Sequence, residues 1–130
     1  MASSPAFAVY PEIGHGLVSI ANANRDGISG SGYVVFASGA SLGTRVAEIV
    51  VQATGTTTAG MVRVYVSGAG VTNSPLFDEI SISAATPSAS TKATRVSTTY
   101  NNLVLQSGQF LRATTHNAEG INVFALGADL

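Results

Sequence analysis

The sequence predicts an all-β protein, a single-domain antiparallel β-sandwich of the jelly-roll kind with about eight strands. Three observations predict this fold. Apolar and polar residues alternate in short runs, as in Met61–Ser67, where valines occupy every second position. Turn-forming residues separate such runs roughly every 8–12 residues. No convincing helix and no internal repeat are present, which argues against bundles, propellers and solenoids.

The first element expected is an extended N-terminal arm, residues 1–16, followed by the sandwich domain, residues 17–130. Two prolines interrupt regular structure in the arm. We expect the arm to add to a neighbour's sheet edge or to dock in a groove, the alternative being a frayed terminus. Its apolar anchors are Phe7, Val9 and Tyr10.

The runs after the arm are expected to be strands bounded by Gly, Asn, Ser and Pro. Thr44–Ala53 is the one contender for a helix, since several of its apolar residues fit a helical stripe. Its β-branched residues favour a strand. The expected strands are Leu17–Ala21, Tyr33–Ala37, Thr44–Ala53, Met61–Ser67, Leu76–Ser83, Thr94–Tyr100, Leu103–Gln106, Gln109–Thr115 and Ile121–Leu126.

Charge is scarce in this chain of 130 residues: charged residues make up 10%, and the net charge is −1. An ordinary soluble domain has about 25%. Scattered basic residues argue against nucleic acid and against an anionic membrane as partners. Interface cores are depleted in charge, so we expect protein to cover much of this surface. The alternative is a very stable structural β-protein with a hydroxyl-rich face.

The outward row of Met61–Ser67 is a specific case of this shortage. Its members Met61, Arg63 and Tyr65 coat a strand poorly against water. We expect a neighbouring subunit or a second copy of the chain to cover them. Lys92 and Arg95, the only basic pair close in sequence, are further candidate contacts.

Enzymatic chemistry is not expected. The chain has two histidines and no Gly-x-Ser-x-Gly elbow that would support a Ser–His–Asp triad. The absence of cysteine excludes disulfides and thiolate metal sites. His116 and Glu119 fit a hairpin loop better than a metal site, and the Gly27–Gly32 stretch lacks the lysine of a phosphate loop. No metal and no cofactor are expected.

One acidic pair has a structural interpretation. Asp78 and Glu79 are adjacent in an expected strand, so their side chains face opposite sides and cannot share one substrate. A strand-facing acid paired with a cross-strand arginine is the preferred interpretation.

Two stretches resemble a known family. "ASLGTRVAEIVVQATGTTTAGMVRVYV" and the closing "LRATTHNAEGINVFALGADL" are similar to capsid decoration (cement) proteins of tailed bacteriophages, of the jelly-roll kind. The similarity spans roughly Ala40 to Leu130.

The resemblance implies a structural virion protein on the outer capsid surface. It implies that the chain bridges major capsid protein subunits, as a dimer or trimer, and braces the shell. One alternative is a tail- or spike-associated β-sandwich module that binds a host glycan, and another is a subunit of a tail tube or neck.

Overall fold

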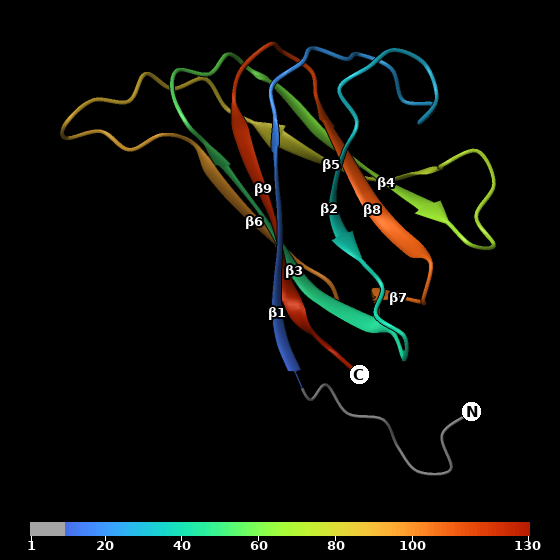
Figure 1. Cartoon of the computed structure of the whole chain (residues 1–130). Coiled ribbons are helices and arrows are strands. Elements are labelled where there is room, and N and C mark those ends of the chain that lie inside the picture. Colours follow the sequence, from blue (N-terminus) through green and yellow to red (C-terminus); the bar gives the residue numbers. More distant parts are fainter. Residues whose placement is uncertain (1–9) are drawn as a thin grey trace.

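Nine β-strands in two antiparallel sheets form the structure, a computed structural model in which residues 10–130 are described (Figure 1). No helix occurs within those residues, so the all-β sandwich is confirmed. The strands are β1 (Tyr10–Val18), β2 (Val34–Ser38), β3 (Thr44–Ala53), β4 (Gly60–Gly68), β5 (Leu76–Ile82), β6 (Arg95–Thr99), β7 (Val104–Leu105), β8 (Gln109–Thr115) and β9 (Ile121–Asp129).

The order of the strands is that of a jelly roll. The first sheet runs β1-β9-β3-β6, with β7 also beside β3, and the second runs β2-β8-β4-β5. The first strand therefore pairs with the last, β2 with β8, β3 with β6 and β7, and β4 with β5, as in a long hairpin folded over on itself. A jelly roll has eight strand positions. Because β6 and β7 pair with successive parts of the same edge of β3, together they occupy one of these positions.

The expected boundary of the arm at residue 16 needs correction. Tyr10 to Val18 pairs with β9 along its whole length, from Tyr10 opposite Asp129 to Val18 opposite Ile121. An edge strand tolerates Pro11 because a proline can turn its missing N–H away from the ladder. The strand expected at Leu17–Ala21 therefore begins earlier, and Phe7 and Val9 lie outside the described residues.

The core lies between the inner faces of the two sheets. Ile49 and Val51 from β3 and Val123 from β9 face Val62 and Val64 from β4, and none of these side chains is exposed. Burying such side chains provides about 1.5–3 kcal/mol each relative to exposure. The cluster at the centre of the core is apolar, and Thr115, directly opposite Val62 and 2% exposed, adds a polar side chain on the same inner face.

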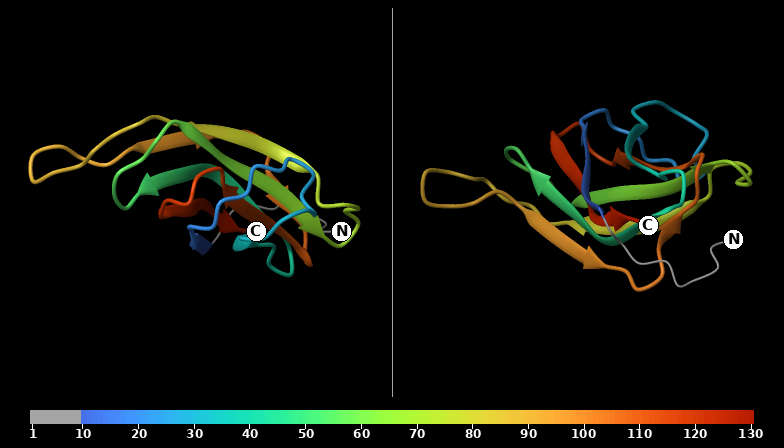
Figure 2. Two further views of the ribbon diagram at one scale, coloured as in Figure 1. Left: turned by 90° about the horizontal axis from the view of Figure 1, so that it is seen from above. Right: turned by 60° about the horizontal axis from the view of Figure 1, so that its bottom comes forward.

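The two sheets approach closely at one edge and are joined at the other by a long connection. A Cβ added to Gly14 in β1 would lie 2.1 Å from the Phe36 carbonyl oxygen in β2, so glycine is what permits this approach. At the opposite edge, the β5–β6 connection, residues 83–94, projects away from the body (gold in Figures 1 and 2). A backbone bridge between Thr57 and Ala85 holds its base.

Candidate interaction surface

The chain itself covers the outer face of the second sheet over the middle of β4. Arg63 and Tyr65 point outward from β4, yet they are 1% and 0% exposed. The β1–β2 loop, residues 19–33, lies over them. The expectation that a neighbouring subunit or a second copy covers these two residues is therefore wrong, and only Met61 in that row is half-buried rather than buried.

Side chains from β4 and β8 hold this loop by donating hydrogen bonds to its carbonyl oxygens. Arg63 Nη1 donates to Asn22 O at 3.2 Å, and the Tyr65 hydroxyl donates to Asn24 O at 2.8 Å. Arg112 Nη2, on β8, donates to Gly27 O at 2.7 Å. Hydrogen bonds from long polar side chains thus attach the loop to the sheet. Burial raises the pKa of the Tyr65 hydroxyl, which keeps it a neutral donor.

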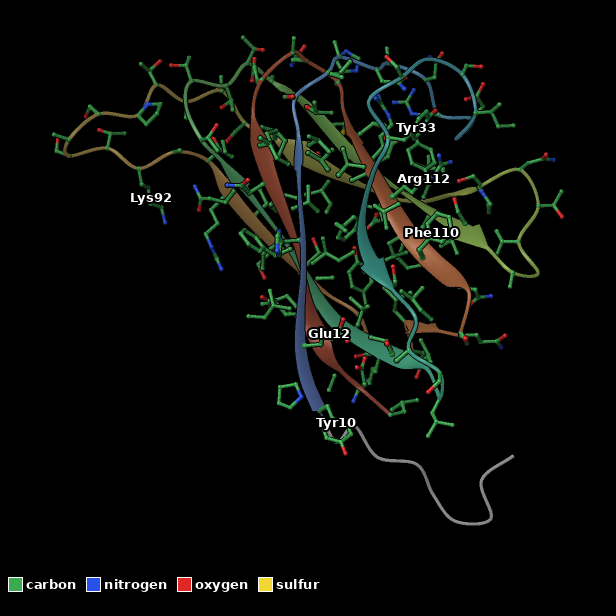
Figure 3. All side chains as sticks on the ribbon, in the orientation of Figure 1. Tyr10, Glu12, Tyr33, Lys92, Phe110 and Arg112 are labelled. Carbon is green, nitrogen blue, oxygen red and sulfur yellow. The ribbon has the colours of Figure 1, made fainter. Side chains whose placement is uncertain are left out.

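Aromatic packing adds to this polar attachment. The Tyr33 and Tyr65 rings meet edge to face at 5.4 Å between centroids. The Arg112 guanidinium stacks 4.5 Å above the Tyr33 ring (Figure 3). The stretch Gly27–Gly32 is thus part of a structural loop.

The loop is also ordered from within. Asp26 accepts hydrogen bonds from the Ser29 hydroxyl at 2.5 Å and from the backbone N–H groups of Ile28 and Ser29 at 3.0 and 2.9 Å. These bonds, the hydroxyl first, lower the pKa of Asp26 to about 2. Gly27 is buried with a φ of 74°, where an added Cβ would meet the Ser74 carbonyl at 1.9 Å. A glycine is therefore required at this point.

The outer face of the first sheet, which we call the A face, is apolar over β1 and β9. Directly opposed residues of an antiparallel pair share a face. The strand register places Ile13 beside Leu126, His15 beside Phe124, and Leu17 beside Asn122. Val50 continues the second of these rows on β3.

A groove of about 280 Å³ runs across the A face. Two apolar side chains of β1 on the A face are well exposed: Ile13, which lines the groove, at 66%, and Leu17 at 51%. Nothing within residues 10–130 covers them, in contrast to the second sheet. The lining residues of the groove are Ile13, Val50, Gln52, Arg95, Phe124 and Leu126.

The remaining sequence-predicted contact residues lie at separate places. Arg95 borders the A-face groove, where β6 supplies the polar rim. Tyr10 is 68% exposed at the start of β1, and Lys92 is exposed on the projecting β5–β6 connection (Figure 3). Only Arg95 thus joins the apolar groove directly, and Tyr10 extends the strand that borders it.

Sequence reasoning missed the main members of the A face: Ile13, Leu17, Phe124 and Leu126. A signal for them was present. Two neighbouring strands carry apolar residues at consecutive positions, so that both faces of each strand are apolar. These runs are Val123–Leu126 and Ile49–Val51. A continuous apolar run predicts a strand with both faces covered.

A second hollow, of about 270 Å³, lies beside an aromatic pair. The Phe77 and Tyr100 rings are 5.4 Å apart, and Asn101, Asn102 and Leu103 complete the lining. The Tyr100 hydroxyl donates to Asp78 Oδ2 at 2.6 Å. Burial, and then this hydrogen bond, raises the pKa of Tyr100, so the phenol stays protonated.

The polar residues considered for chemistry have structural partners. Glu119 accepts hydrogen bonds from the Thr58 N–H and hydroxyl, which ties the β8–β9 loop to the β3–β4 loop. Glu79 lies opposite Arg63 on the neighbouring strand, with 3.8 Å between Arg63 Nε and Glu79 Oε1, as the cross-strand interpretation expects.

Neither a metal cluster nor a membrane-spanning helix occurs in the described part of the chain. Residues 10–130 contain no group of three or more His, Asp or Glu side chains placed to hold a metal ion. They also contain no helix long and apolar enough to cross a bilayer.

Comparison with known proteins adds no relative: no family model, no curated protein and no solved structure matches the chain. Fold and surface together define a class, a jelly-roll sandwich in which a loop of the chain covers part of one outer face and an uncovered, mainly apolar groove crosses the other.

Proposed function

We propose that this chain is a structural virion protein that decorates and stabilises the outside of a phage icosahedral capsid by bridging major capsid protein subunits. The A face is the proposed contact surface. The observation that supports this is the exposure of the apolar side chains of Ile13 and Leu17 on a sheet face with an apolar-lined groove, which no part of the described chain covers. Exposed apolar patches on soluble proteins mark interaction sites.

Binding to a shell requires no chemistry beyond such a surface. A protein that binds only the assembled shell stabilises it by mass action, by about 2.7 kcal/mol per site when its free concentration is a hundredfold above its Kd. The polar rim, with Arg95 and Glu48 on neighbouring strands, would set the orientation. In this proposal the chain assembles on the shell as a dimer or trimer.

The test uses shells of the encoding phage that lack this protein. The Ile13→Ser/Leu126→Ser variant removes apolar area from the A face without touching the core. It should lose about tenfold or more in shell affinity, measured by co-sedimentation, because central apolar contacts carry most of the binding energy. Leu42→Ser is the matched control, since Leu42 is 78% exposed in the β2–β3 turn, away from the A face. Wild-type occupancy by the double variant would contradict the proposal.

Glycan recognition by a tail- or spike-associated module is the second candidate function. The hollow beside Phe77 and Tyr100 favours it, since aromatic rings stack on sugars and the amides of Asn101 and Asn102 offer hydrogen bonds. Binding on a glycan array that is lost in Phe77→Ala would favour this candidate. A decoration protein is expected to bind no glycan there.

A further inference from the structure

A hollow of about 410 Å³ opens beside Arg63, next to the rim of the β1–β2 loop. It lies on the outer side of the second sheet, where β4 and β5 meet the β8–β9 loop. Basic and hydroxyl groups converge on it, although the chain as a whole is poor in charge. The polar lining side chains are Arg25, Arg63, Ser81 and His116.

The Arg63 guanidinium at the floor of this hollow has unused donors. Nη1 donates to Asn22 O at 3.2 Å, and Nη1 and Nη2 each lie 3.3 Å from the same His116 Nδ1. Nε is buried and has no hydrogen-bond partner. The edge formed by Nε and Nη2 is therefore incompletely satisfied, although the side chain is only 2% exposed.

The neighbouring acid forms an ion pair with this edge but no hydrogen bond to it. Glu79 Oε1 lies 3.8 Å from Arg63 Nε, beyond hydrogen-bond distance. Glu79 is instead held by Arg25, whose Nε donates to Oε1 and whose Nη2 donates to Oε2 at 3.4 Å. Two arginines thus share one carboxylate, which leaves one uncompensated positive charge among the three.

We propose that this hollow binds a carboxylate, seated on the Nε–Nη2 edge of Arg63 with Arg25 and Ser81 at its rim. A guanidinium edge matches a carboxylate with two parallel hydrogen bonds, and one excess positive charge matches a monoanion. The carboxylate comes either from a free small molecule or from an acidic side chain of a bound protein segment. The inference needs only the folded chain and stands apart from the proposed function.

The test follows the Arg63 Nε–Hε signal by NMR in the full-length protein. Titration with acetate should move this signal saturably, whereas sodium chloride at equal ionic strength should not. A second titration uses N-acetyl-glutamate amide, with the glutamine analogue as its control. Tighter binding of the glutamate compound than of acetate assigns the site to a protein side chain, and the reverse order assigns it to a free carboxylate. Equal shifts with acetate and chloride, and none with the glutamate compound, would overturn the proposal.

Two variants of the residues next to Arg63 sharpen the test while Arg63 itself stays unchanged. Glu79→Gln removes the competing negative charge and should tighten acetate binding by about threefold or more. Arg25→Ala releases Glu79 to pair with Arg63 and should weaken binding by about tenfold. Arg45→Ala, exposed on the other sheet, is the control and should bind acetate as wild type does. Unchanged affinity in both Glu79→Gln and Arg25→Ala would refute the assignment of the site.

Discussion

Tyr65 is a fully buried tyrosine whose hydroxyl serves a loop rather than a partner protein. The hydroxyl donates to Asn24 O at 2.8 Å, and the ring packs edge to face on Tyr33. Arg63 and Arg112 attach the same loop at Asn22 and Gly27. The outward row of β4 therefore anchors the β1–β2 loop.

Removing the hydroxyl alone tests this anchoring. Tyr65→Phe should lower the free energy of unfolding by about 1 kcal/mol, because the Asn24 carbonyl of the loop loses its donor while the ring stays in place. Urea denaturation measures this directly. Tyr10→Phe is the matched control, since Tyr10 is 68% exposed, and it should leave the midpoint unchanged. Equal stability of Tyr65→Phe and wild type would show that the hydrogen bond does not hold the loop.

The burial of the individual outward residues of β4 could not be predicted from the sequence. Local alternation correctly places Arg63 and Tyr65 opposite the core-facing valines. What covers them depends on contacts with residues 41 positions away in the chain. No local pattern carries such a contact, and a polar loop rich in Gly and Asn gives no sign of the sheet beneath it.

Among the elements, the strands were the most predictable part of the fold. Thr44–Ala53 and Gln109–Thr115 coincide with β3 and β8 residue for residue, because β-branched and alternating residues specify strands locally. The exception is β1, where Pro11, Gly14 and Gly16 suggest irregular structure. Pairing with β9 overrides that preference.

Gly14 provides a test of how β1 closes the sandwich. Gly14→Ala should destabilise the protein by about 1–3 kcal/mol, because its Cβ would meet the Phe36 carbonyl and force β1 away from β2. Gly55→Ala is the control: an added Cβ there meets nothing within 4 Å, so the change should stay within about 0.5 kcal/mol. Thermal or urea unfolding compares the two, and equal effects would contradict the close approach of the strands.

The β1–β2 loop should respond to acid through Asp26. Its pKa is lowered in the folded chain to about 2, from an ordinary value of 3.8, so the folded state favours the carboxylate. The stabilisation is present above the ordinary value and is lost as the pH falls through about 2. Asp26→Asn removes this contribution. The difference in urea midpoint between wild type and Asp26→Asn should therefore shrink from pH 5 to pH 2, and a constant difference would contradict the prediction.

For the whole molecule, the shortage of charge has two physical origins. On the second sheet, the chain's own loop removes the outward side chains of Arg63 and Tyr65 from water. On the first sheet, Ile13 and Leu17 remain exposed on the A face and await a partner in the proposed function. The low charge predicts that protein covers much of the surface, but it cannot say which face the chain covers itself, since this depends on the path of one loop.

The copy number per particle tests the proposed decoration of a capsid most directly. Quantitative mass spectrometry of purified particles gives the ratio of this chain to the major capsid protein. The account predicts on the order of hundreds of copies per particle, because a symmetric shell repeats the same contact site across its surface. A handful of copies, as at a single vertex or tail, or none at all, would contradict it.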